Sequence, residues 1–121
     1  MRMTKIKTVL HDPKAGQTDG LVFELEDGSR VILSLDGDCC SQSTFEKNSL
    51  DDASGLVGDE LRALEHVSSA IPNVGGYGED STQYSAVKVT TDKQVVVLDW
   101  RNESNGYYSG TCDIIGWKGN E

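Results

Sequence analysis

The segment that decides our interpretation of this chain is Trp100-Arg101-Asn102-Glu103-Ser104-Asn105-Gly106-Tyr107-Tyr108-Ser109-Gly110. It follows the most apolar run of the sequence, Val95-Val96-Val97-Leu98, which is typical of a buried strand. Asn105-Gly106 is a strong signal for a two-residue hairpin turn, because a type I′ turn requires positive φ at both central residues. The sequence therefore predicts that residues 94–101 and 107–115 are strands that pair with each other through this turn.

The side chains around this turn are more varied than a turn requires, and they suit ligand binding better than catalysis. Arginine offers a planar fork for an anion, amides can orient a ligand, and tyrosine rings offer faces on which a base can stack. The simpler alternative is a hairpin whose tyrosines pack on the sheet. On the binding hypothesis, the candidate ligand-binding residues in this segment are Arg101, Asn102, Ser104, Asn105, Tyr107 and Tyr108.

A second hairpin is predicted nearer the N-terminus. Apolar residues alternate along residues 21–25 and again along residues 31–35, and Asp27-Gly28 between them is a turn signal. One face of this hairpin is fully apolar, so we expect it to lie in the core. Further strands are predicted at residues 6–10 and 83–91, and Asp92-Lys93 is a turn signal between residues 83–91 and the strand at residues 94–101.

The segment Asp36-Gly37-Asp38-Cys39-Cys40-Ser41-Gln42-Ser43 follows this hairpin. Asp36 or Asp38 can cap a short helix that runs to about residue 48, with Phe45 facing inward. Free backbone N–H groups at such a helix start would form a small anion site. On this hypothesis the second wall of the ligand site consists of Asp38, Ser41 and Ser43. Residues 50–58 are predicted to be an acidic loop.

The fold class depends on residues 59–70, which allow two interpretations. Leu61, Leu64 and Val67 fit helical spacing, whereas the alternative is an edge strand. With 121 residues, the chain is long enough to form one domain, residues 1–121, with a core of its own. We expect an α+β fold: a twisted, mostly antiparallel sheet of five or six strands with one or two short helices.

Composition and charge argue against several classes of protein. The net charge of −9 opposes broad binding to nucleic acid or to anionic membranes, because both carry negative charge. The sequence has no apolar stretch long enough for a transmembrane helix, and its start does not resemble a signal peptide, so we expect a cytoplasmic protein. The three cysteines do not form a disulfide framework and are expected to be free thiols.

Residue spacing gives little support to a catalytic or metal site. The candidate ligands Cys39, Cys40, Cys112, His11 and His66 lack zinc-ligand spacing such as Cys-x2-Cys, so we expect no metal and no cofactor. A cysteine nucleophile with His66 as its base, or a small hydrolase acting through Cys39 or Asp38, stays open as a less favoured alternative. We expect that the protein is not an enzyme.

Two motifs resemble those of a known family. Asp36-Gly37-Asp38-Cys39-Cys40-Ser41 precedes Leu56-Val57-Gly58, and Arg101-Asn102-Glu103-Ser104-Asn105-Gly106-Tyr107-Tyr108-Ser109-Gly110 follows it, as in a family of small phage and bacterial domains. The resemblance covers about residues 6–115. Within this family the pattern is similar to the phage anti-Thoeris sponges, small oligomeric proteins that bind cyclic ADP-ribose-type signals, and in some cases cyclic oligonucleotides, without cleaving them. It implies that residues 59–70 contain a strand.

The resemblance also implies a function. The protein would bind and sequester a small cyclic nucleotide immune signal in the host cytoplasm, without enzymatic activity, and so block anti-phage defence. Its partners would be the nucleotide-like ligand and further copies of itself in a homo-oligomer, with no nucleic acid and no membrane. The main alternative is an acidic protein–protein inhibitor of a host defence enzyme or a nucleic-acid enzyme.

Overall fold

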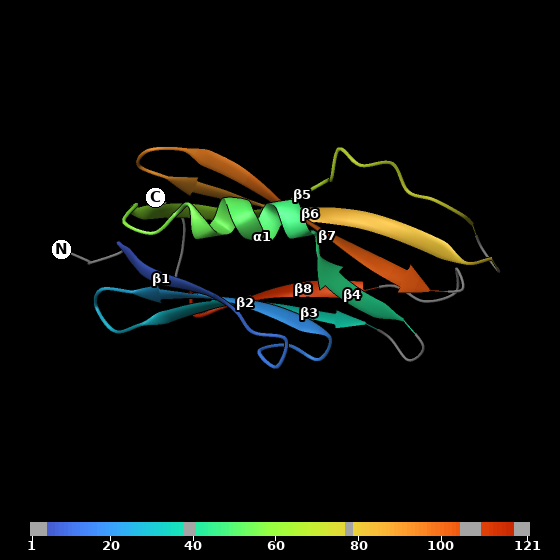
Figure 1. The fold of residues 1–121 in the computed structure, drawn as a ribbon, viewed down its shortest axis with the longest axis horizontal. Helices are drawn as coiled ribbons and strands as arrows, with labels where there is room; N and C mark the ends of the chain where they lie inside the picture. Colours follow the sequence, from blue (N-terminus) through green and yellow to red (C-terminus); the bar gives the residue numbers. More distant parts are fainter. Residues whose placement is uncertain (1–4, 38–40, 77–78, 105–109, 118–121) are drawn as a thin grey trace.

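The protein folds into two four-stranded antiparallel sheets that enclose a shared core (Figure 1). The structure is a computed structural model, and it describes residues 5–37, 41–76, 79–104 and 110–117. The first sheet has the strand order β1-β2-β3-β8, with β1 (Ile6–His11), β2 (Asp19–Leu25), β3 (Arg30–Gly37) and β8 (Gly110–Ile115). The second has the order β4-β7-β6-β5, with β4 (Gln42–Phe45), β7 (Val95–Ser104), β6 (Ser81–Thr91) and β5 (Leu61–Val67).

The core lies between the inward faces of the two sheets. Alternation along β2 and β3 directs every second side chain inward, and the predicted apolar face of this hairpin is buried. In the second sheet, Val87 and Val89 of β6 and Leu98 and Trp100 of β7 extend the same core. Removing this apolar surface from water is the main favourable term in folding, at about 25 cal/mol per Å².

Two predicted hairpin turns are present in the structure. Gly28 between β2 and β3 has a φ of 89°, in the left-handed region that glycine enters without a steric penalty. Between β6 and β7, the hydroxyl oxygen of Thr91 accepts the backbone N–H groups of Lys93 at 3.2 Å and Gln94 at 3.1 Å. Both hairpins are local in sequence, which is why alternation and turn residues predicted them correctly.

The C-terminal strand pairs differently from the prediction. β8 runs antiparallel to β3, with Gly37 opposite Gly110, whereas β7 lies in the other sheet between β4 and β6. The prediction that residues 107–115 pair with residues 94–101 is therefore wrong. Pairing with β3 places Cys112 opposite the buried Leu35, so β8 extends the apolar inner face of the first sheet. The Asn105-Gly106 signal lies outside the described residues.

The helix α1 (Lys47–Ser54) begins later in the chain than predicted. Residues 42–45 form the strand β4 and not part of a helix that starts at Asp36 or Asp38, although Phe45 is buried as expected. The backbone of β4 pairs with β7, a partner that local sequence signals do not show. The helix takes up much of the predicted acidic loop, and it contacts both β7 and β1, so it covers one side of the core.

The number of strands also differs from the expectation. The described part of the chain forms eight strands in two sheets and one helix, where we expected five or six strands and one or two helices. The domain is small and mostly antiparallel β, as predicted. The strand β5 decides between the two interpretations of residues 59–70 in favour of an edge strand. Within the ranges given above, none of the helical structure is long and apolar enough to cross a membrane.

Candidate functional site

Polar side chains gather at the end of the molecule where β3 and β7 end and β4 and β8 begin. The strand register defines this end, because Gly37 of β3 lies opposite Gly110 of β8 and Glu103 of β7 lies opposite Gln42 of β4. We call this cluster the polar seam, because its hydrogen bonds join the two sheets. The polar seam consists of His11, Thr18, Asp19, Ser41, Ser43 and Asn102.

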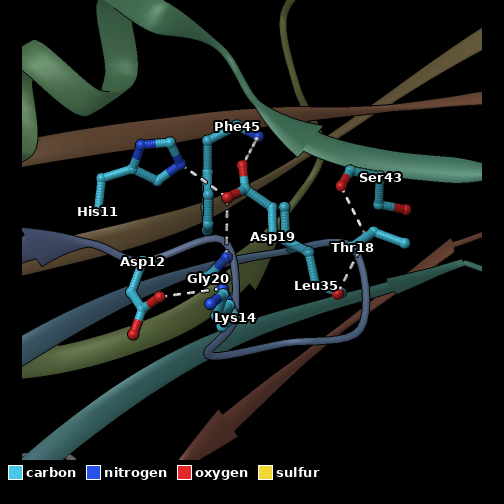
Figure 2. Close-up of polar contacts among 9 residues, drawn as sticks. All are labelled: His11, Asp12, Lys14, Thr18, Asp19, Gly20, Leu35, Ser43 and Phe45. Carbon is cyan, nitrogen blue, oxygen red and sulfur yellow. Dashed lines mark hydrogen bonds and ion pairs between the residues drawn. The ribbon is translucent and has the colours of Figure 1, made fainter.

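Asp19 is a buried carboxylate at the start of β2, and it connects the first sheet to β4 (Figure 2). Its Oδ1 accepts the backbone N–H of Gly20 at 2.9 Å and lies 2.6 Å from Nε2 of His11. Its Oδ2 accepts the backbone N–H of Phe45 at 3.0 Å. Because a carboxylate only accepts hydrogen bonds, Nε2 of His11 carries the proton in this contact. One side chain thus fixes β1, β2 and β4 relative to one another.

Thr18 makes a second link between the sheets, next to Asp19. Its hydroxyl lies 2.7 Å from the carbonyl oxygen of Ser43 and 3.0 Å from that of Leu35 (Figure 2). On β4, Ser43 and Phe45 present these backbone groups on the edge that faces away from β7. An uncovered strand edge leaves backbone groups unpaired, so Thr18 and Asp19 together close the edge of β4.

Asn102 points from β7 into the same cluster and is 2% exposed. Its Nδ2 donates to Oγ of Ser43 at 3.0 Å and to Oγ of Ser41 at 3.2 Å. Oγ of Ser43 in turn donates to the carbonyl oxygen of Asp36 at 2.9 Å. A Cβ at Gly110 would collide with Oγ of Ser43 and lie 2.8 Å from Nδ2 of Asn102. Glycine at this position therefore lets β8 pass directly against the polar group.

Two buried polar atoms on one face of β7 have no hydrogen-bond partner among the described residues. They are Oδ1 of Asn102, an acceptor, and Nε1 of Trp100, a donor. The two residues are two positions apart on a strand, so their side chains share a face. An unpaired buried polar atom destabilises a protein by about 1–3 kcal/mol, and such atoms in native proteins require an explanation.

Arg101 faces away from the polar seam, because it is the neighbour of Asn102 on the strand. Its Nη1 lies 2.9 Å from Oε1 of Glu46, and its Nε lies 2.9 Å from Oε1 of Glu103. The hydrogen bond to Glu46 is the main cause that raises the pKa of Arg101 above its ordinary value. The predicted site residues Arg101 and Asn102 therefore lie on opposite faces of β7, and two carboxylates occupy the guanidinium fork.

The structure brings together some of the other predicted site residues. Ser41, Ser43 and Asn102 form one hydrogen-bonded group. Ser104 lies beyond Asn102 on the same face of β7, with its Oγ 3.4 Å from Oγ of Ser81. The predicted site residues that lie outside the described part of the chain are Asp38, Asn105, Tyr107 and Tyr108.

The sequence-based hypothesis did not include Thr18 and Asp19, and it considered His11 only as a metal ligand. One signal was available for Asp19. It lies two positions before Leu21, so in a strand the two side chains point to the same face, which is the core face. A charged residue at such a position must find partners, since burying a charge without them is costly. Its partner Phe45 lies 26 residues further along the chain, so spacing alone does not reveal the contact.

The groups considered for catalysis or metal binding do not form a shared site where the structure describes them. No set of three or more His, Cys, Asp or Glu side chains in those ranges is placed to hold a metal ion. Burial, with the charges of Asp113 and Asp36, raises the pKa of the Cys112 thiol to about 12, so at neutral pH this thiol is protonated and a poor nucleophile. His66 is exposed on β5, and Cys39 and Cys40 lie outside the described residues.

The two sheets and the polar seam define a small antiparallel β domain with a buried polar centre at one end. The chain belongs to a family described as a domain of unknown function, DUF7448, whose model matches residues 2–114. No curated protein matches the chain, and no solved structure does.

Proposed function

We propose that this protein binds a small nucleotide-like ligand without altering it, and that the polar seam holds the ligand. The observation that carries the proposal is the carboxamide of Asn102. It is 2% exposed and bonded to two serines, while its Oδ1 has no partner within the described ranges. A few well-placed polar groups in an otherwise apolar site are the usual means by which proteins orient small ligands.

The ligand class comes from the resemblance of the two sequence motifs to those of the phage anti-Thoeris sponges. One hydrogen bond supports a common site for these motifs, because it joins Ser41 of the first motif to Asn102 of the second. We therefore propose that the ligand is a cyclic ADP-ribose isomer or a cyclic oligonucleotide. The protein would sequester it in the host cytoplasm and so block an anti-phage defence. A homo-oligomer in which copies enclose the ligand is part of this proposal.

The hydrogen bonds of the seam support binding more than catalysis. The hydroxyl proton of Ser43 is donated to the carbonyl oxygen of Asp36, so Ser43 has no base beside it that would activate it as a nucleophile. The Nδ2 group of Asn102 is likewise engaged with two serines. Groups held in this way provide a rigid surface for recognition, which lowers the entropic cost of binding.

Native mass spectrometry of the purified full-length protein, followed by calorimetry, tests the proposal. We expect an oligomer that carries or takes up a ligand from a panel of cyclic ADP-ribose isomers and cyclic oligonucleotides, and that releases it intact on heating. Asn102→Ala should weaken binding by about 1–3 kcal/mol, since it removes a buried hydrogen-bonding group. Thr44→Ala is the matched control, because Thr44 neighbours Ser43 on β4 and faces the opposite side of the sheet.

Three results would separate the alternatives. A greater loss of affinity for Arg101→Ala than for Asn102→Ala would place the ligand on the outer face of β7. A cleaved product after incubation would indicate an enzyme. No binding across the whole panel would reject the proposal.

A second candidate function is inhibition of a host defence enzyme or nucleic-acid enzyme through an acidic surface. The observation that favours it is the net charge of −9, which attracts basic surfaces and repels anions. A pull-down with the purified protein at low and high salt tests this candidate, because an electrostatic complex should dissociate as salt is raised.

A further inference from the structure

The orientation of the Asn102 carboxamide is fixed by a chain of hydrogen bonds that begins at the backbone of β3. The carbonyl oxygen of Asp36 can only accept, so Ser43 must give its hydroxyl proton to it, at an O–O distance of 2.9 Å. Oγ of Ser43 can then only accept from Asn102, which requires that Nδ2 and not Oδ1 face it at 3.0 Å. The geometry therefore decides which end of the amide points to the serines, a choice that the shape of an amide leaves open.

The consequence is that the amide presents an acceptor, and not a donor, to any molecule that reaches it. Oδ1 is buried and has no partner where the structure describes the chain, while both hydrogens of Nδ2 are directed to Ser41 and Ser43. Three residues near the amide, Ser41, Ser104 and Gly110, are half buried, whereas Asn102 itself is 2% exposed. Oδ1 of Asn102 therefore lacks a hydrogen-bond donor among the described residues.

The charges near the seam also disfavour an anionic group at this point. Arg101, the cation nearest to Asn102 in the sequence, lies on the opposite face of β7 and is paired with Glu46 and Glu103. A phosphate or a carbonyl oxygen placed at Oδ1 would bring two acceptors together without a proton between them. A neutral N–H group would instead complete the hydrogen bonding of the amide.

We propose that Oδ1 of Asn102 selects the ligand by its base, and that it requires an amino or imino N–H where hypoxanthine carries an oxygen. This inference rests on the proposed function, since it assigns the specificity of the same site. Adenine-bearing ligands meet the requirement at position 6, whereas their hypoxanthine counterparts present an oxygen there. Ser43 is the residue that sets the specificity, because its bond to Asp36 prevents the amide from turning over.

Calorimetry with matched ligand pairs tests this inference on the intact protein. The probes are cyclic ADP-ribose with its hypoxanthine analogue, and cyclic di-AMP with its 1-methylhypoxanthine analogue, because in both analogues N1 carries a carbon and the edge of the base offers no N–H. We expect the adenine member of the pair that binds to have an affinity about tenfold or more higher, as for a buried acceptor left unpaired by the other member. The comparison needs no variant, so it does not depend on the folding of a mutant.

Ser43→Ala then tests the assigned mechanism. Without the Ser43 hydroxyl, the amide is free to turn over and present Nδ2, so the adenine preference should fall to about threefold or less. Thr44→Ala should keep the full preference, and thermal melts followed by circular dichroism verify that both variants are folded. Equal affinity of wild-type protein for the two members, or an unchanged preference in folded Ser43→Ala, would overturn the inference while leaving the proposed function intact. Binding of neither member of either pair would also overturn the inference, whereas the proposed function is rejected only if nothing in the wider panel of cyclic ADP-ribose isomers and cyclic oligonucleotides binds.

Discussion

Among the residues that the structure describes, one buried polar network lies at each end of the sheets, and the two differ in one respect. At the end opposite the polar seam, Oδ2 of Asp59 accepts the hydroxyl of Thr91 at 2.9 Å and Nε2 of Gln94 at 2.8 Å. Its own backbone carbonyl oxygen accepts the N–H of Ile6 at 2.8 Å. At the seam, Asn102 makes two comparable bonds but keeps one acceptor unpaired within the described residues.

This difference distinguishes a carboxylate that links segments of the fold from an amide that also keeps an unpaired acceptor. The Asp59 network connects the start of β1, the region before β5 and the turn between β6 and β7, and each bond in it stabilises the fold. The seam contains both kinds of group. Both carboxylate oxygens of Asp19 accept hydrogen bonds, and these bonds link the two sheets. In this respect Asp19 resembles Asp59. The amide of Asn102 instead keeps one hydrogen-bond acceptor, Oδ1, that no described residue pairs with.

The largest effect is expected for Asp19→Ala, which should lower the free energy of unfolding by about 3 kcal/mol or more, because it leaves buried backbone N–H groups of Gly20 and Phe45 without their acceptor. Urea denaturation measures the change. Asp12→Ala is the matched control, since Asp12 lies in the connection between β1 and β2 that leads to Asp19, and it accepts the exposed backbone N–H of Lys14 at 3.0 Å. We expect the control to lose less than about 1 kcal/mol. Equal losses in the two variants would contradict a structural role for the buried carboxylate.

A smaller and pH-dependent effect is expected for Asp59→Asn. The hydrogen bond from Gln94 is the main cause that lowers the pKa of Asp59 below its ordinary value of 3.8, and Thr91 and the charge of Lys93 act in the same direction against desolvation. A carboxylate whose pKa is lowered by folding stabilises the protein above its unfolded pKa, and this stabilisation is lost as the pH falls through the folded pKa.

We therefore expect Asp59→Asn to lower the free energy of unfolding by about 1 kcal/mol at pH 7, the difference between a charged and a neutral hydrogen-bonded acceptor. The gap between wild type and variant should close as the pH is lowered below about 4. Urea denaturation at a series of pH values checks this. If the free energies of unfolding of wild type and variant stay equally far apart down to pH 3, the charge of Asp59 does not contribute to stability.

The local part of the fold was predictable from the sequence, and the long-range part was not. Alternation along residues 21–35 and the turn at Asp27-Gly28 predicted the β2–β3 hairpin, because both signals are contained in neighbouring residues. The pairing of β8 with β3 depends on which strand edge is still open after the hairpins have formed. That is a property of the whole sheet and not of neighbouring residues. Four residues of β4 are too few to show a period, so the capping signal at Asp36 and Asp38 predicted a helix there.

The candidate site was predictable in its residue types but not in its geometry. Ser41, Ser43 and Asn102 stood out as polar residues in two separate motifs, and the structure joins them. Arg101 stood out equally, but strand alternation turns it to the other face, where Glu46 from a distant part of the chain pairs with it. Partners such as Glu46 for Arg101 and Phe45 for Asp19 are set by tertiary contacts, and residue spacing does not encode them.

The smallest effect on stability is expected for Asn102→Leu. Leucine has the same branched shape as asparagine, and the change removes both the two bonds to Ser41 and Ser43 and the unpaired Oδ1. A lost hydrogen bond destabilises by about 0.5–1.5 kcal/mol, and relief of an unpaired buried acceptor restores about 1–3 kcal/mol, so the two terms nearly cancel. We expect a net change within about 1 kcal/mol by urea denaturation, together with loss of ligand binding by calorimetry.

Asp59→Leu is the matched substitution in the other network, and it should behave differently. It removes two hydrogen bonds to a charged acceptor, from Thr91 at 2.9 Å and from Gln94 at 2.8 Å, and it relieves no unpaired atom, so we expect a loss of about 3 kcal/mol. Its ligand affinity in the folded fraction should be unchanged, because Asp59 lies at the opposite end of both sheets. If Asn102→Leu destabilises the protein as much as Asp59→Leu does, Asn102 belongs to the structural class, and the retained acceptor is not a binding group.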